Sequence, residues 1–410
     1  MKRRIFVLSF LLTLMCLSIG AQERMTVSGT VVSGSSGQVV KGANVSGGGQ
    51  TVVTNDDGFF LLKSDNTLTS IIVSHVGYRA QNVKVDGRGN TVDGLRIRLQ
   101  PTTVQLQEVL VQAYSDPREL VDAAIRKIPK NYSRQPELYH CFYRETAMKR
   151  QHYIMVAEGV VDMYKTGYGH GSGRDRVAIR KGRRLLSPNQ RDTLSVKVTG
   201  GPVTPVQLDV VKNLDLLLNE EELRKYAMKM EQPTTIGDRL QYVVSISPQV
   251  VEEYALYYGL LYIDQETLAF TRVELNLDVS DRDKATRMML VRKPAGVRFR
   301  PKELSLLVDY HQEGDLTRIS YVRTTFRFNS DWRRRLFATA FTACCEMVVT
   351  SRHDGDTVEP IRGRESFDQR DAFFDKVDYF RDPTFWQDYN IIEPTESLDR
   401  AIDRLLKKSK

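Results

Sequence analysis

The stretch YGLLYIDQETLAF, residues 258–270, decides the fold class. Its aromatic-rich apolar run ends at Ile263, polar residues follow, and a second apolar run begins at Leu268. Two apolar runs separated by a few polar residues are typical of antiparallel strands joined by a tight turn. Because successive strands with short connections usually pair, we expect an antiparallel meander. Its strands are predicted over residues 241–246, 253–263, 270–277, 302–310 and 317–328.

The run over residues 317–328 predicts a strand with two different faces. Val322, Thr324, Phe326 and Phe328 point one way, whereas Arg323, Thr325 and Arg327 point the other. Such alternation predicts a half-buried antiparallel strand. Residues 258–267 are also similar to the hairpins of curved half-barrels in lipoprotein carriers. We therefore expect a mainly β fold whose second part is mixed and mostly antiparallel, with a half-barrel as one form that it can take.

Residues 22–100 carry the pattern of a small β-sandwich. Short β-type runs are separated by Gly, Asn and Asp, which tolerate the positive φ angles of tight turns. About seven short strands in a segment of this length are typical of a sandwich.

Four motifs in this segment carry a family resemblance. In order they are Gly29-Thr30-Val31, Gly42-Ala43-Asn44-Val45, Thr54-Asn55-Asp56-Asp57-Gly58-Phe59-Phe60 and Ser74-His75-Val76-Gly77-Tyr78. With them the segment resembles the carboxypeptidase regulatory-like domain, a transthyretin-like β-sandwich that also precedes many TonB-dependent transporters of the Gram-negative cell envelope. Lys41 departs from the family, which often has proline there, and this departure is expected to alter one turn.

The turn Asn55-Asp56-Asp57-Gly58 has two interpretations. It is expected to reverse the chain so that Phe60 enters the space between the two sheets. Its clustered oxygens could instead bind calcium. Since no further carboxylates follow at a suitable spacing, the turn is the favoured interpretation.

Residues 101–115 are expected to be a linker, and residues 116–410 a mixed α+β domain of unknown function. This region resembles exported proteins in which the regulatory-like domain precedes a region without an established activity. The resemblance lies in the motifs Phe142-Tyr143-Arg144-Glu145, Ala157-Glu158-Gly159-Val160, Lys181-Gly182-Arg183 and Phe385-Trp386-Gln387-Asp388-Tyr389-Asn390.

Peripheral helices are expected around this domain. They are predicted from Asp116 to about Pro129, from Thr204 to about Met230 in one or two pieces, and from Thr395 to Lys408. The first two begin with a capping residue followed by proline. The last has an apolar stripe that fits docking on the β domain, with contact to a membrane surface as the alternative; the stripe consists of Leu398, Ala401, Ile402 and Leu405.

The first residues predict export. Three basic residues precede an uncharged run that ends at Ile19, and small residues follow. This order is typical of a secretory signal peptide over residues 1–21, with cleavage expected between Ala21 and Gln22. The protein is therefore expected in the periplasm or at the periplasmic face of the outer membrane.

Composition narrows the choice of partners. The 410-residue chain has 41% hydrophobic residues and a formal net charge of +8, so it can form real cores. No nucleic-acid-binding signature occurs, and nucleic acid is a poor partner for an exported protein. No later run reaches the about 18 apolar residues of a membrane-spanning helix, so the mature chain is expected to have none. The expected partner is an envelope protein, or a lipid or glycan.

Three cysteines remain after removal of the signal peptide: Cys141, Cys344 and Cys345. An odd number argues against a disulfide framework. The adjacent pair lies in the apolar run 336–349, where buried thiols are expected and a vicinal disulfide is the alternative.

The sequence lacks the local motifs of common hydrolases. None of the six histidines is followed by Glu three residues later, so the zinc pair of metallocarboxypeptidases is missing. Neither a Gly-x-Ser-x-Gly elbow nor a phosphate-binding P-loop occurs. A possible metal contact at His353-Asp354-Gly355-Asp356 fits a hairpin tip better. We therefore expect no catalytic residue, no cofactor and no metal site.

A basic segment over residues 174–184 is a candidate for contact with an anionic ligand. Arginine forks suit phosphate or carboxylate groups, but a solvated strand with alternating polar positions is the favoured interpretation. The candidates are Arg174, Arg176, Arg180, Lys181, Arg183 and Arg184.

Three functions remain open at this point. The first is a non-catalytic binding or scaffold role in the cell envelope, with the sandwich as an interaction module. The second is a periplasmic carrier that holds a lipid or lipoprotein acyl chain in a half-barrel. The third is a hydrolase whose site leaves no local motif. A carrier requires an open apolar concavity, whereas a scaffold requires a flat or filled sheet.

Overall fold

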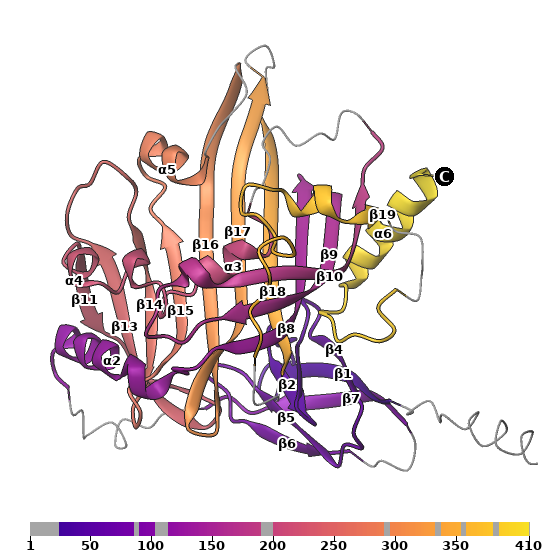
Figure 1. Ribbon diagram of the computed structural model, residues 1–410, viewed down its shortest axis with the longest axis horizontal. Helices are drawn as coiled ribbons and strands as arrows, with labels where there is room; N and C mark the ends of the chain where they lie inside the picture. The colour runs from indigo at the N-terminus through magenta and orange to yellow at the C-terminus, as the bar shows by residue number, and fades with distance from the viewer. Residues whose placement is uncertain are drawn as a thin grey trace, which may run out of the picture.

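The structure is a computed structural model that describes residues 24–85, 90–102, 114–189, 200–290, 296–332, 338–353, 358–379 and 385–409. The expected signal peptide, its cleavage site at Ala21 and Gln22, and most of the expected linker lie outside these residues. A small N-terminal β unit lies beside one large antiparallel sheet, and short helices lie around that sheet (Figure 1).

The N-terminal unit consists of two small sheets, as the turn pattern predicted. One has the strand order β4-β1-β7 and the other the order β3-β2-β5-β6. In the first sheet, β1 runs antiparallel to β4 and parallel to β7. The strands are β1 Met25–Ser33, β2 Asn44–Gly47, β3 Gln50–Val53, β4 Phe59–Ser64, β5 Ser70–Ser74, β6 Gln81–Lys84 and β7 Thr91–Leu99.

Alternating apolar residues from both sheets fill the sandwich core. Val27, Val45 and Phe60 are buried there, and Tyr78 packs at its margin. The tight turn before β4 places Gly58 at φ 74°. A Cβ atom at this position would lie 2.8 Å from the Val31 carbonyl oxygen, so only glycine fits.

The large sheet has the order β11-β13-β14-β15-β16-β17-β18-β8-β9-β10-β19, with β12 beside β13. The strands from β13 to β17 form the expected meander, which continues into β18, and β8 to β10 form a second one that joins at β18. The sheet ends at β11 and β19 and is not closed. The strands are β8 Glu137–Lys149, β9 His152–Lys165, β10 Arg176–Leu186, β11 Tyr226–Met230, β12 Thr234–Ile236, β13 Arg239–Pro248, β14 Tyr257–Asp264, β15 Phe270–Leu277, β16 Val297–Glu313, β17 Leu316–Trp332, β18 Thr339–Arg352 and β19 Asp378–Tyr379.

The large sheet has an apolar inner face and a polar outer face. On β17, Val322 and Thr324 belong to the inner face, while Arg323 and Thr325 belong to the outer face, as their alternation predicted. The inner face forms the largest apolar core. The sandwich and the C-terminal residues 385–398 lie against the outer face.

The observed helices agree only in part with those predicted from the sequence. Helix α2 Pro117–Asn131 begins after the Asp116 cap as expected, but it continues past Pro129 because the Tyr132 N–H still bonds to the Ile128 carbonyl. The prediction of a helical block that extends to about Met230 is wrong. The block contains the short pieces α3 Val203–Gln207, η3 Leu214–Leu216 and α4 Glu220–Leu223.

The helix prediction fails at the end of the block because the residues there alternate in the manner of a strand. The sequence YAMKM of β11 alternates between buried and exposed positions, and its backbone pairs with β13. Sheet hydrogen bonds that come from a distant strand therefore override the local helical tendency. The remaining helices are η1 Ser172–Arg174, α5 Arg282–Met289, η4 Phe373–Lys376 and α6 Glu396–Ser409.

Helix α6 confirms the expectation of docking on the β domain. The Thr395 hydroxyl accepts a hydrogen bond from the Leu398 amide at 3.1 Å and so caps the helix. Leu398 and Ile402 pack with Val156 and Leu185 of β9 and β10. Among the helices of the described chain, none has both the length and the apolar character to cross a bilayer.

Candidate functional site

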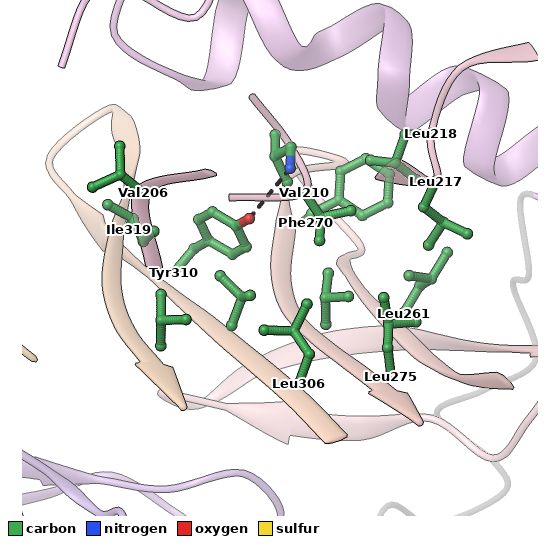
Figure 2. Packing of buried hydrophobic residues seen from close by; sticks show 14 of the residues in the cluster. Val206, Val210, Leu217, Leu218, Leu261, Phe270, Leu275, Leu306, Tyr310 and Ile319 are labelled. Carbon is green, nitrogen blue, oxygen red and sulfur yellow. Dashed lines mark hydrogen bonds between the residues drawn. The ribbon is translucent and has the colours of Figure 1, made fainter. Parts of the chain in front are cut away.

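The inner face of the sheet is occupied by the protein's own chain. Residues 203–223 cross this face and insert Val206, Val210, Leu217 and Leu218 among strand residues such as Phe270 (Figure 2). All four side chains are buried. In the described part of the chain, these strands therefore form a filled sheet and not an open apolar concavity.

Buried charges fix the crossing segment in place. The Lys165 Nζ atom lies 2.7 Å from an Asp209 carboxylate oxygen, and Lys212 lies at the same distance from Asp175. Burial raises the pKa of Asp209, but the Lys165 charge and its hydrogen bonds outweigh this effect and hold the pKa below its ordinary value. Burial, together with the Lys165 charge, lowers the pKa of Lys212 to about 8.

A polar cavity of about 520 Å³ lies on the opposite, outer face, between the sheet, the sandwich and the start of α6. We name it the junction cavity. Five cationic and five anionic side chains line it. Its three walls come from parts of the chain that are far apart in sequence, so only the tertiary structure brings them together.

The Asn55-Asp56-Asp57-Gly58 turn of the sandwich contributes one wall of the junction cavity. The Asn55 side-chain oxygen accepts hydrogen bonds from the amides of Asp57 and Phe59, each at 3.0 Å. The Asn55 amide group donates to the Glu393 and Pro394 carbonyl oxygens. Because donors of the protein occupy these oxygens, the turn docks the sandwich, and calcium is not needed to explain its composition.

The two aspartates of this turn also reach outward. Asp56 forms a bidentate pair with Arg323 of β17, at 3.1 and 3.3 Å. An Asp57 carboxylate oxygen accepts a hydrogen bond from the Glu396 amide at 2.8 Å, in the first turn of α6. The turn therefore connects the sandwich to both the large sheet and the C-terminal helix.

The floor of the junction cavity holds a buried arginine. Arg144 is 3% exposed, and its guanidinium lies 2.7 Å from Glu158 and 3.6 Å from Glu346. The Tyr321 hydroxyl donates to Glu346 at 3.1 Å. Arg144 also donates to the Ile392 carbonyl at 2.6 Å, which fixes the C-terminal segment over the sheet.

Two further ion pairs line the cavity. Arg327 lies 3.2 Å from Glu303, and Arg272 lies 2.6 Å from Glu274. Together with the Arg323 and Arg144 pairs, these contacts match four cations with four anions. Each carboxylate is therefore a hydrogen-bond acceptor with a fixed orientation.

Cys344 faces the junction cavity, and its neighbour Cys345 is buried on the inner face. Both are free thiols, as is the buried Cys141; of the pair expected to be buried, Cys345 is buried and Cys344 is half-buried. The vicinal disulfide does not form. Burial raises the pKa of the Cys344 thiol to about 11, which keeps it protonated near neutral pH.

The predicted basic segment lies apart from the cavity lining, on η1 and β10. Arg183 pairs with Glu158, Arg180 pairs with Asp162, and Lys181 donates to the Phe385 carbonyl. Arg184 donates to the Phe374 carbonyl, and Arg176 donates to the Gly173 carbonyl. Arg174 is exposed, with no ion pair within the described chain.

The positions of these six side chains determine which of them can contact an external anion. Five of the six side chains already contact carbonyl or carboxylate oxygens of their own chain, whereas Arg174 and the exposed Arg180 still face solvent. Contact with an external anion therefore remains a prediction, mainly for these two arginines.

Sequence reasoning missed the residues of the junction cavity. The alternation of Arg323, Thr325 and Arg327 with apolar neighbours was a visible signal that β17 has a polar face. It did not indicate that a second unit covers this face. The described residues contain no group of three His, Cys, Asp or Glu that could hold a metal ion, His353 is exposed, and residues 354–357 lie outside the described chain.

Fold and site together define a β protein of two units with a polar cavity at their junction. Residues 27–111 match the model of the CarboxypepD_reg-like domain, so the N-terminal sandwich is a carboxypeptidase regulatory-like domain. No curated protein matches the sequence.

Several solved structures resemble the chain weakly. An outer membrane lipoprotein-sorting protein domain from Vibrio parahaemolyticus is 11% identical, with 60% of this chain and 95% of that chain covered and a TM-score of 0.26. A DUF1329 family protein from Desulfovibrio piger is 10% identical, with coverage of 60% and 96% and a TM-score of 0.24. A membrane-associated protein of unknown function from Bacteroides fragilis is 10% identical, with coverage of 81% and 99% and a TM-score of 0.16. Likeness at this level establishes neither a shared fold nor a shared function.

Proposed function

We propose that the protein is an exported, non-catalytic binding or scaffold protein of the cell envelope. The observation that carries this proposal is the junction cavity, which the regulatory-like domain and the outer face of the sheet enclose together. A domain that completes a cavity contributes directly to what the cavity binds. The sandwich is then the interaction module, acting in the periplasm or at the periplasmic face of the outer membrane.

Two features favour binding over catalysis. Burial raises the pKa of Asp56, but the paired Arg323 guanidinium outweighs this effect and holds the pKa below its ordinary value, which disfavours a role as a proton donor. The thiol of Cys344, with its pKa raised to about 11, is a poor nucleophile near neutral pH.

The carrier function has less support. A lipid carrier requires an accessible apolar hollow, and the strands that would line it are packed against Val206, Val210, Leu217 and Leu218. Opening that hollow would separate the buried Lys165–Asp209 pair and expose the apolar core.

Native mass spectrometry of the mature protein, isolated from a fractionated periplasm, tests the proposal. We expect a mature chain that begins at Gln22 and carries a stoichiometric protein or glycan partner. A copurifying phospholipid or acyl chain would support the carrier instead. Turnover of a glycan or peptide by the purified protein would support the hydrolase.

A further inference from the structure

We propose that the junction cavity binds an uncharged, polyhydroxylated ligand, namely a segment of a neutral glycan. This inference rests on the proposed function, because it names the ligand class and the residues of a non-catalytic binding site. The cavity volume of about 520 Å³ lies within the range of about 300–1,000 Å³ that is typical of small-ligand sites.

The charge balance of the cavity favours a neutral ligand. The five cationic and five anionic lining side chains sum to zero, and four of each are matched with one another. The two that remain are Lys41 of the sandwich and Glu393 of the C-terminal segment. A ligand with a net charge would have to separate an existing pair or remain without a counter-charge in a partly buried site.

Hydroxyl groups on neighbouring strands offer the hydrogen bonds that a sugar needs. Ser305 of β16 lies opposite Thr325 of β17, and Thr325 and Thr146 both lie opposite Cys344 of β18. Thr342 lies two residues before Cys344 on the same face. The hydroxyls of Thr146, Thr325 and Thr342 have no hydrogen-bond partner among the described residues, although each can donate and accept.

Fixed charges and aromatic rings complete the site. Glu346 and Glu303 offer acceptors, and Arg323 and Arg327 offer planar forks of donors, whose orientation the ion pairs already set. Tyr153 and Tyr321 add aromatic surface to the lining. Sugar hydroxyls both donate and accept hydrogen bonds, so a glycan can use both kinds of group at once, which a purely cationic or anionic ligand cannot.

Isothermal titration calorimetry of the mature chain with three neutral trisaccharides, namely maltotriose, cellotriose and triacetylchitotriose, tests the proposal. Trigalacturonate and the chitosan trimer serve as the anionic and cationic probes. The variant Thr325→Trp fills the cavity from the middle of β17. Asn329→Trp is the matched control, because Asn329 lies on the same strand and face, four residues further on and outside the lining.

We expect at least one neutral trisaccharide to bind, and Thr325→Trp to weaken its binding by about tenfold or more, while Asn329→Trp leaves it within about twofold. If Thr325→Trp does not fold, the double variant Thr325→Val/Thr342→Val removes two hydroxyls without added bulk and should weaken binding in the same direction. Binding of charged probes alone, binding of none of the neutral trisaccharides, or an equal loss in the control would overturn the inference.

The same experiment separates this inference from the proposed function. A trisaccharide that binds and is then cleaved, as chromatography of the products would show, supports the site but contradicts a non-catalytic role. A stoichiometric partner in native mass spectrometry, together with no sugar binding, supports the proposed function but contradicts a glycan site.

Discussion

At the scale of single residues, buried charged side chains form ion pairs where distant parts of the chain meet. On the inner face, Asp209 receives Lys165 and the hydroxyls of Tyr168 and Tyr310, each within 2.8 Å. On the outer face, Glu158 receives Arg144, Arg183 and the Trp386 indole N–H. A buried ion pair adds little net stability, but the loss of one partner leaves an uncompensated charge. Such clusters therefore specify where a segment lies.

Asp209→Ala should destabilise the protein by about 3–5 kcal/mol, because it leaves Lys165 charged and buried without its nearest counter-ion. Urea denaturation at neutral pH measures the loss. The control Glu220→Ala removes the Arg224 pair on the surface, where both side chains are more than two-thirds exposed, and should change little. Equal effects in the two variants would contradict the role of the buried cluster.

Glu145 makes the stability of the protein depend on pH. Its side chain is buried, it accepts a hydrogen bond from the Tyr143 hydroxyl at 2.6 Å, and burial raises its pKa from 4.5 to about 7. As the pH rises, Glu145 therefore loses its proton at a lower pH in the unfolded chain than in the native state, and this ionisation favours unfolding. Between about pH 4.5 and pH 7 the native state should lose on the order of 3 kcal/mol from this group.

Glu145→Gln should flatten this pH dependence, since the amide stays neutral in both states. Urea denaturation at pH 5 and pH 8 should give a smaller difference for the variant than for the wild type. The exposed Glu221→Gln is the control and should retain the wild-type slope. An unchanged slope in the Glu145 variant would exclude Glu145 as the source.

At the scale of elements, one turn attaches the sandwich to the large sheet and to the C-terminal helix. The Asn55-Asp56-Asp57-Gly58 turn was predicted from its residues, and Phe60 is buried behind it as expected. Its contacts with Arg323, the Glu393 and Pro394 carbonyls and the Glu396 amide could not be predicted, because they join residues more than 250 positions apart.

Substitutions of Asn55 should separate the two roles of this turn. Asn55→Ala removes both the accepted and the donated hydrogen bonds and should destabilise by about 2–4 kcal/mol. Asn55→Asp keeps the acceptor inside the turn but loses the donors to residues 393 and 394. Hydrogen exchange should therefore accelerate at the Asp57 and Phe59 amides in the alanine variant only, and near Glu396 in both. Protection near Glu396 that survives both changes would contradict the docking role.

At the scale of the whole molecule, apolar contacts surround the polar junction cavity. Val53 of the sandwich packs with Phe142, Val348 and Trp386, and α6 packs nearby on β9 and β10. The first contact buries apolar area between the two units, and the second fixes α6 on the large sheet. The cavity lies between the units, and charged and polar side chains from the sandwich, the sheet and the C-terminal segment line much of it.

Val53→Asp should loosen the sandwich from the sheet, because it places an unpaired carboxylate in this apolar contact, at a cost of at least about 2 kcal/mol. Small-angle scattering should show a larger radius of gyration, and thermal unfolding should become less cooperative. Val39→Asp is the matched control, since Val39 belongs to the sandwich but is 49% exposed. An unchanged radius in the Val53 variant would contradict this account of the junction.

The sequence alone determined the local features of this protein. Periodicity predicted the strands from β13 to β17, capping residues predicted the starts of α2 and α6, and four motifs predicted the family of the sandwich. These features depend on neighbours within a few residues. Tertiary structure alone decided three others: the β11 strand, the filling of the inner face by residues 203–223, and the junction cavity. Each of these depends on the burial and pairing of residues distant in sequence, where tertiary contacts outweigh local preference.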